Sequence, residues 1–137
     1  MNFFLKIFKF LPPEIAHNLA LESLNLLYKT RLLGFFYKKV KSEPKVFAGM
    51  HFQNMLGTAA GLDKNGDYID CLGALGFGFL EVGTVTPEKQ YGNSKPRVFR
   101  NFQENAIINR LGFNNKGVDY LVKNLKSRKY DGIVGVN

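Results

Sequence analysis

The sequence predicts an α/β fold in which a short parallel sheet follows an amphipathic helical hairpin. Apolar residues recur every three or four positions through the first 36 residues, and residues 42–44 interrupt that periodicity like a linker. From residue 55 onward, strand patterns alternate with helical patterns. This β-α-β-α-β order predicts parallel strands, because each pair needs a crossover connection. We therefore expect a helical region over residues 1–41 and an α/β region over residues 42–137.

The helical region contains two amphipathic patterns separated by Pro12 and Pro13. The second begins at Pro13 and Glu14, residue types that are favoured in a first helical turn, and ends near Gly34. The first predicted helix covers residues 3–11, with an apolar face of Phe3, Phe4, Ile7, Phe8 and Leu11. The apolar face of the second comprises Ile15, Leu19, Ala20, Leu24 and Leu27.

Charge is concentrated in the same region. The 137 residues carry a net charge of +8, and residues 1–41 hold seven Lys or Arg against two Glu. An apolar and basic hairpin has two interpretations: it covers the rest of the protein, or it lies in a membrane interface. Charged residues interrupt every apolar run before it reaches the roughly 18 residues that a membrane-spanning helix needs.

The α/β region is expected to begin with a short hairpin over residues 46–52. The predicted strands cover residues 55–60, 79–84 and 133–136, and the predicted helices cover residues 67–75 and 116–127. An insertion over residues 87–115, with β-like pieces at 97–99 and 106–108, follows the second strand. Ligands of parallel α/β proteins bind at the carboxyl ends of the strands, so this long loop points to function.

Small and polar residues gather where the predicted strands end. Residues 59–61 are small enough for a flat ring to approach the backbone, and Lys64 adds a positive charge beside them. Thr84 ends the second strand, and Asn109, Asn114 and Asn115 offer paired donors and acceptors. Each has a purely structural alternative: a glycine-rich turn, a threonine satisfied by backbone, or asparagine turns.

The only cysteine, Cys71, is expected to lie on the first α/β helix and to face the core between that helix and the strands. No His or Cys is spaced from it as a metal site or a catalytic nucleophile would require. No metal site is predicted. A single cysteine and the lack of a secretory signal pattern favour a reducing, cytosol-facing compartment.

Five motifs in one order resemble the class 2 dihydroorotate dehydrogenases, which are membrane-associated and quinone-dependent. The motifs are Gly57 to Gly66, Leu72 to Gly78, Glu81 to Pro87, Lys95 to Arg100 and Ile108 to Asn115. The resemblance runs from the helical N-terminus to Asn137. It implies the N-terminal part of a (β/α)8 TIM barrel, about its first three strands, preceded by an amphipathic helical hairpin.

The resemblance also implies a reaction. FMN would oxidise dihydroorotate to orotate in pyrimidine (UMP) synthesis, and ubiquinone or menaquinone would reoxidise the flavin. A whole barrel needs about 250 residues, and the family's catalytic serine lies beyond the position of Asn137. We therefore expect no catalytic residue within this chain, and little turnover from these 137 residues alone.

The resemblance assigns roles to individual positions. Lys64 would bind both flavin and orotate, and we expect Lys64, Thr84 and Asn109 to face one hollow. The implied FMN contacts are Ala60, Gly61, Leu62, Asp63, Lys64, Thr84 and Asn137. The implied substrate contacts are Lys64, Asn109, Arg110, Leu111, Gly112 and Phe113. His17 and Arg100 match positions that line the quinone tunnel.

The resemblance of the hairpin to the membrane-associated hairpin of the family implies a peripheral membrane protein that contacts the phospholipid surface, on the cytoplasmic face of the inner membrane if the source is bacterial. The alternative function is a peripheral membrane-binding module without catalysis. Nucleic-acid binding is not predicted, because the basic residues cluster with phenylalanines and no nucleic-acid-binding motif is present.

Overall fold

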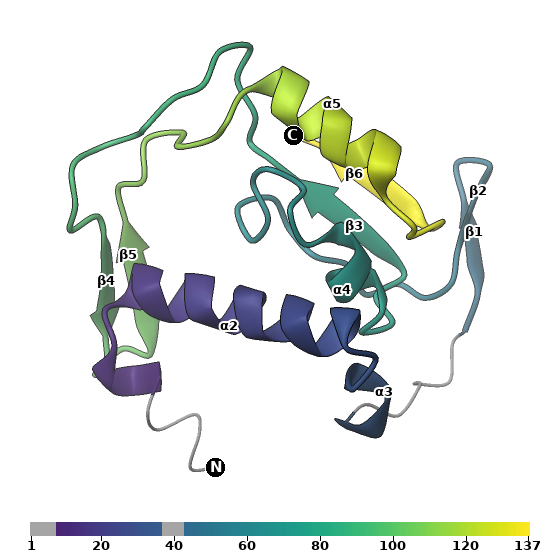
Figure 1. Ribbon diagram of the computed structural model, residues 1–137, viewed down its shortest axis with the longest axis horizontal. Helices are drawn as coiled ribbons and strands as arrows, with labels where there is room; N and C mark the ends of the chain where they lie inside the picture. The colour runs from purple at the N-terminus through teal and green to yellow at the C-terminus, as the bar shows by residue number, and fades with distance from the viewer. Residues whose placement is uncertain (1–7, 37–42) are drawn as a thin grey trace.

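A computed structural model describes residues 8–36 and 43–137, and within them three two-stranded sheets (Figure 1). The central sheet is parallel and pairs β3 (Phe79–Val82) with β6 (Ile133–Val136). The other two are antiparallel hairpins, β1 (Lys45–Phe47) with β2 (Met50–Phe52) and β4 (Val98–Asn101) with β5 (Ala106–Asn109). The helices are α2 (Pro13–Lys29), α3 (Leu33–Phe36), α4 (Ile69–Gly73) and α5 (Val118–Ser127).

The core forms where α2, α4 and α5 meet β3. Leu80 and Val82 alternate with half-buried residues along β3, and both are only 1% exposed. They form one cluster with Leu21, Ile69, Leu72 and Leu121. Figure 1 shows α2 lying across the molecule, with the β4–β5 hairpin beside its first turns. The parallel pairing and both α/β helices confirm the predicted α/β order.

The predicted first strand, residues 55–60, is the clearest error of the sequence analysis. The segment forms a single parallel bridge, Gly57 to Phe79, instead of a strand. The Thr58 hydroxyl accepts the Glu81 amide at 3.2 Å, so a side chain takes a bond that a backbone carbonyl would make in a continuous ladder. The chain still runs beside β3, because the Gly61 amide donates to the Gly83 carbonyl at 2.7 Å.

Helix α4 is shorter than the predicted helix over residues 67–75. At its start, the Asp63 carboxylate accepts the amides of Asp67 and Tyr68 at 2.9 and 2.8 Å. At its end, Gly76 adopts a φ of +85°, a conformation that ends helices and favours glycine. Cys71 is 1% exposed in this helix, which confirms its predicted place in the core.

The apolar face predicted for the second helix is partly wrong. Ala16 and Leu21 are the buried residues of α2, whereas Ile15 and Leu19 are 55% and 47% exposed. The predicted face lies beside the buried one, so α2 packs on the core and also presents apolar side chains outward. The exposed apolar side chains of α2 and α3 are Ile15, Leu19, Leu26, Phe35 and Phe36.

The first predicted helix lies mostly outside the described residues, as does Ser42 of the predicted linker. Residues 8–10 are helical, and the Arg100 guanidinium donates to the carbonyls of Lys9 and Leu11 at 3.0 and 2.6 Å. These two bonds attach the chain before α2 to β4. In the described part of the chain, every helix is too short or too polar to cross a bilayer.

The burial of Leu80 predicts the cost of truncating it. Leu80→Ala should lower the free energy of unfolding by about 2–5 kcal/mol, because it removes buried methyl groups and leaves a cavity. Leu26→Ala is the matched control, since Leu26 is 63% exposed on α2, and should change stability by less than about 0.5 kcal/mol. Urea unfolding followed by circular dichroism measures both, and equal losses would contradict this core.

Candidate functional site

A cleft of about 600 Å³ lies between α2, residues 61–67 and the β4–β5 hairpin. It brings together eight of the residues singled out in the sequence: Gly61, Leu62, Asp63, Lys64, Asn109, Leu111, His17 and Arg100. The other implied contacts are not among its lining residues, namely Ala60, Thr84, Arg110, Gly112, Phe113 and Asn137. The cleft therefore joins the implied flavin, substrate and quinone positions at one place, but only in part.

Lys64 is a half-buried cation of the cleft. Its ammonium donates to Asn114 Oδ1 at 2.8 Å. Burial lowers the pKa of Lys64, the positive charge of Arg97 lowers it further, and Glu14 opposes the shift. A partly desolvated ammonium with one neutral partner gains from a second, anionic one. The cleft thus offers a positive charge to a ligand that carries a carboxylate.

Asp63 performs a structural task. Its side chain is only 3% exposed, and both carboxylate oxygens accept backbone amides of the loop that leads into α4. Burial raises the pKa of Asp63, while the amides of Tyr68 and Asp67 counteract that effect. Asp63 holds the loop that carries Lys64, and its predicted contact with a cofactor stays a prediction.

Thr84 and Asn137 form a second polar position at the ends of β3 and β6. The Thr84 hydroxyl hydrogen-bonds to the side chain of Asn137. The Asn137 backbone donates to Val82 O and accepts from Val85 N, both at 2.9 Å. Thr84 is thereby held toward β6, so the structure brings Lys64 and Asn109 to one hollow and leaves Thr84 outside its lining.

The implied substrate loop, residues 109–113, is held mainly by its backbone. Asn109 Oδ1 accepts the Leu111 amide at 3.4 Å, and the Arg110 guanidinium lies 6.0 Å from the Phe99 ring. Gly112 has a φ of +70°, and an added Cβ would come within 2.9 Å of Asn93 Nδ2. Glycine is required there, because a side chain would clash and the backbone would be strained.

The two asparagines after this loop have different roles. Asn114 contacts Lys64 in the cleft. Asn115 is buried and bonds with Thr86, Phe113 O and the Gly117 amide. Its backbone also pairs with Gln90. For Asn115 the structural alternative is correct, because this side chain fixes the insertion and the start of α5.

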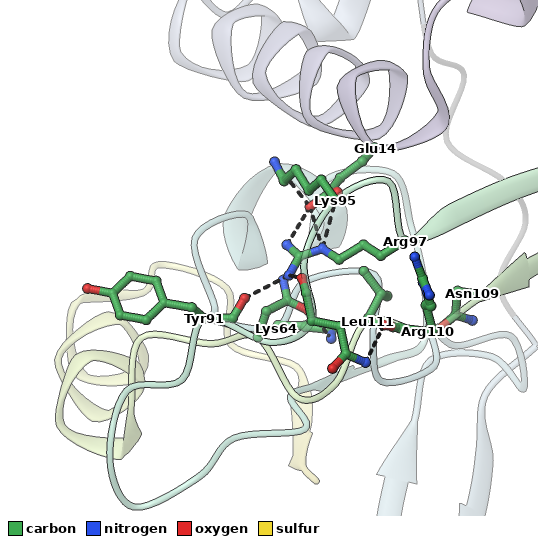
Figure 2. A network of polar contacts seen from close by, with 10 residues as sticks. Glu14, Lys64, Tyr91, Lys95, Arg97, Asn109, Arg110 and Leu111 are labelled. Atoms are coloured by element: carbon green, nitrogen blue, oxygen red, sulfur yellow. Dashed lines mark hydrogen bonds and ion pairs between the residues drawn. The ribbon is translucent and has the colours of Figure 1, made fainter.

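Sequence reasoning missed the ion pair between Arg97 and Glu14. Arg97 is 7% exposed, and its Nη2 lies 2.6 Å from Glu14 Oε1 (Figure 2). The hydrogen bond with Arg97 lowers the pKa of Glu14 against the opposing effect of burial. The two residues are 83 positions apart, so no local spacing could reveal the contact. The available signal was an arginine between Pro96 and the start of β4.

Other chemistries have little support in the described residues. Across residues 8–36 and 43–137, no three His, Cys, Asp or Glu side chains come together as a metal site would require. Burial raises the pKa of Cys71 to about 11, which leaves the thiol protonated and unreactive at neutral pH.

The role of Asp63 gives a stability prediction. Asp63→Ala should lower the free energy of unfolding by about 1–3 kcal/mol, because two backbone amides lose their acceptor. Asp131 is exposed, so Asp131→Ala is the matched control and should change stability by less than about 0.5 kcal/mol. Chemical denaturation measures both variants. An Asp63→Ala variant as stable as the control would refute the structural role.

Comparison with known proteins agrees with this geometry. A family model described as dihydroorotate dehydrogenase matches residues 44–137. The dihydroorotate dehydrogenase (quinone) of Psychrobacter arcticus is 56% identical over 125 residues, which cover 91% of this chain and 36% of that protein. The corresponding protein of Aeromonas salmonicida is 53% identical over 131 residues, covering 96% of this chain and 39% of that protein.

A solved structure shows the same relationship. The crystal structure of DHODH from Eimeria tenella in complex with ferulenol matches with a TM-score of 0.73 and 36% sequence identity, covering 91% of this chain and 35% of that one. The chain therefore spans between a third and two fifths of the length of these relatives. Because the family model covers well over half of the chain, the chain belongs to the dihydroorotate dehydrogenase family.

Proposed function

We propose that a full-length protein containing these 137 residues oxidises (S)-dihydroorotate to orotate, with FMN as cofactor and ubiquinone or menaquinone as electron acceptor. The observation that carries the proposal is the half-buried ammonium of Lys64 in a cleft that Asn109 also lines. Relatives at 53% to 56% identity bear the name dihydroorotate dehydrogenase (quinone), which supports the same reaction.

The substrate is a small anion with a planar, polar ring, and the cleft complements both features. Lys64 would bind the carboxylate, since a charge-assisted hydrogen bond is strongest where water is partly excluded. The Asn109 amide would bond to the pyrimidine edge, which carries carbonyl and N–H groups. Leu111 gives this side of the cleft an apolar surface.

The residues at the rim fit a flavin. Gly61 has a φ of +101°, and nothing lies within 4 Å of the place where a Cβ would stand. A flat ring could rest on this open surface beside Ala60, with the Thr84 and Asn137 side chains at an adjoining edge. FMN, when bound, supplies the two-electron chemistry that side chains lack. Lys64 would hold a positive charge near the ring.

We also propose a place for the chain in a larger fold. The segment at Gly57, β3 and β6 would be the first three strands of a (β/α)8 barrel, in the order that the bridge and the parallel ladder support. Such a barrel needs about 250 residues. The 137 residues alone should therefore show little turnover, and the catalytic base would come from the remainder of the full-length protein.

The quinone would approach from α2. His17 and Arg100 line the cleft on the side where α2 meets β4, and apolar side chains of α2 and α3 are exposed next to basic residues. We infer that this face contacts the phospholipid surface, which makes the full-length protein a peripheral membrane protein. Without flavin or orotate binding, the same surface would fit the alternative of a non-catalytic membrane-binding module.

Substitution of Lys64 tests the substrate site. In the full-length protein, Lys64→Ala should raise the dissociation constant of orotate about tenfold or more, because a hydrogen bond to a charged group contributes about 1.5–3 kcal/mol. Lys123→Ala is the control, since Lys123 is exposed on α5. Titration with orotate, followed by the flavin absorbance, measures both. Equal affinities would remove Lys64 from the proposed site.

Vesicle binding tests the membrane surface. Phe35 and Phe36 are 84% and 78% exposed, and replacing both by serine should weaken binding to phosphatidylglycerol-containing vesicles at least about tenfold, because each buried phenylalanine contributes about 1.5–3 kcal/mol. Tyr91→Ser is the control, since Tyr91 is 78% exposed on the insertion. Cosedimentation measures the bound fraction. Unchanged binding by the double variant would rule out this face.

A further inference from the structure

Arg97 joins the distant helix α2 to the insertion segment that precedes β4. Its Nε and Nη2 donate to the Glu14 carboxylate of α2, at 3.2 and 2.6 Å. Its Nη1 donates to the carbonyls of Tyr91 and Asn93, at 2.7 and 3.1 Å. Figure 2 shows the guanidinium between these partners. The planar, forked donor set of arginine satisfies all of them at once, which a lysine ammonium cannot do.

The segment that Arg97 holds in turn holds the implied substrate loop. Asn93 Nδ2 donates to Arg110 O at 2.8 Å, and the Asn93 amide donates to Leu111 O at 3.0 Å. The Arg110 amide donates to the carbonyl of Arg97 itself, at 2.8 Å. Three hydrogen bonds, two of them between backbone groups, therefore connect Arg97 and Asn93 to residues 110 and 111, directly after Asn109.

The same ion pair also affects which charged groups are available to the Lys64 ammonium. Glu14 and Lys64 both line the cleft, so a free Glu14 carboxylate would compete with a substrate carboxylate for the ammonium. Arg97 engages that carboxylate at 2.6 Å, and exposed Lys95 adds a weaker contact at 3.5 Å. With Glu14 occupied, the neutral Asn114 is the hydrogen-bond partner of the Lys64 ammonium within residues 8–36 and 43–137.

We propose that Arg97 is a positioning residue for substrate binding: it joins Glu14 of α2 to the loop at residues 109–111 and keeps Glu14 away from Lys64. This inference rests on the proposed function, because it assumes that the cleft binds an anionic pyrimidine. Arg97→Lys keeps a positive charge beside Glu14, so it avoids the stability loss of leaving one partner unpaired, whereas it removes the forked contacts that fix the geometry. Positioning therefore predicts a loss of orotate affinity that exceeds any loss of stability.

The test uses the full-length, flavin-loaded protein and the variants Arg97→Lys, Glu14→Gln and Lys95→Ala. Arg97→Lys keeps the charge and loses the forked contacts, so the orotate dissociation constant and the KM for dihydroorotate should rise about tenfold. The KM for a soluble quinone should stay within about twofold of the wild-type value. A general loss of structure would instead raise both KM values. Lys95→Ala removes only the exposed partner of Glu14 and should match the wild type.

Amide hydrogen exchange gives a readout that needs no turnover. In Arg97→Lys, the amides of residues 110–112 should exchange about tenfold faster, while those of core strand β3 stay unchanged. Glu14→Gln decides the case if Arg97→Lys fails to fold: it removes the charged partner of Arg97, so the amides of residues 110–112 should again exchange faster, while those of β3 stay unchanged. Wild-type exchange and wild-type orotate affinity in a folded variant would overturn the proposal.

Two outcomes distinguish a failure of this inference from a failure of the proposed function. If the wild-type protein binds no orotate, the proposed function fails, and the exchange of residues 110–112 still decides whether Arg97 positions the loop. If wild type and Arg97→Lys bind orotate equally well, the proposed function stands and the positioning role is refuted. Parallel loss of orotate affinity, quinone KM and melting temperature, as in Leu80→Ala, would also refute it.

Discussion

The cleft depends on one ion pair between buried Arg97 and half-buried Glu14, which joins the N-terminal helix to the long insertion. Glu14 begins α2 and Arg97 precedes β4, so their contact fixes the two walls relative to each other. Burial of a charged pair costs desolvation, and that cost is offset only when every donor finds a partner. For Arg97, the carbonyls of Tyr91 and Asn93 supply partners for Nη1 in addition to the carboxylate of Glu14.

At the base of the cleft, a buried charged group is again satisfied by hydrogen bonds, but its partners are backbone amides. The Asp63 carboxylate is buried without an opposite charge, and backbone amides satisfy it instead. The loop that follows is held rigidly, so Lys64 projects from a fixed backbone toward Asn114. One wall is thus fixed by charge pairing and the base by amide donation, and the half-buried Lys64 ammonium is held where a ligand can reach it.

Sequence patterns predicted the elements that hydrophobic periodicity determines. The β3–β6 ladder, both α/β helices, the β1–β2 hairpin and the two β-like pieces of the insertion form close to their expected residues. Apolar residues alternate along β3, where Leu80 is buried, and follow the helical period along α5, where Leu121 is buried. Residues 55–60 failed as a strand because the Thr58 hydroxyl replaces a backbone acceptor, and propensity does not encode that choice. The face of α2 was misjudged because apolar residues cover more than one side of that helix.

The candidate site was predictable only in part. Motifs identified Lys64 and Asn109, which the fold brings to one cleft. No pattern pairs Glu14 with Arg97 across 83 positions, nor turns the Thr84 hydroxyl toward Asn137, because these contacts exist only once the chain has folded.

The central claim is that Lys64 holds the carboxylate of an anionic pyrimidine inside this cleft. A crystal structure of the full-length protein with orotate tests it most directly. The account predicts the orotate carboxylate about 2.7–2.9 Å from Lys64 Nζ, with the ring edge against the Asn109 amide. Orotate bound elsewhere, with Lys64 still paired to Asn114 alone, would contradict it.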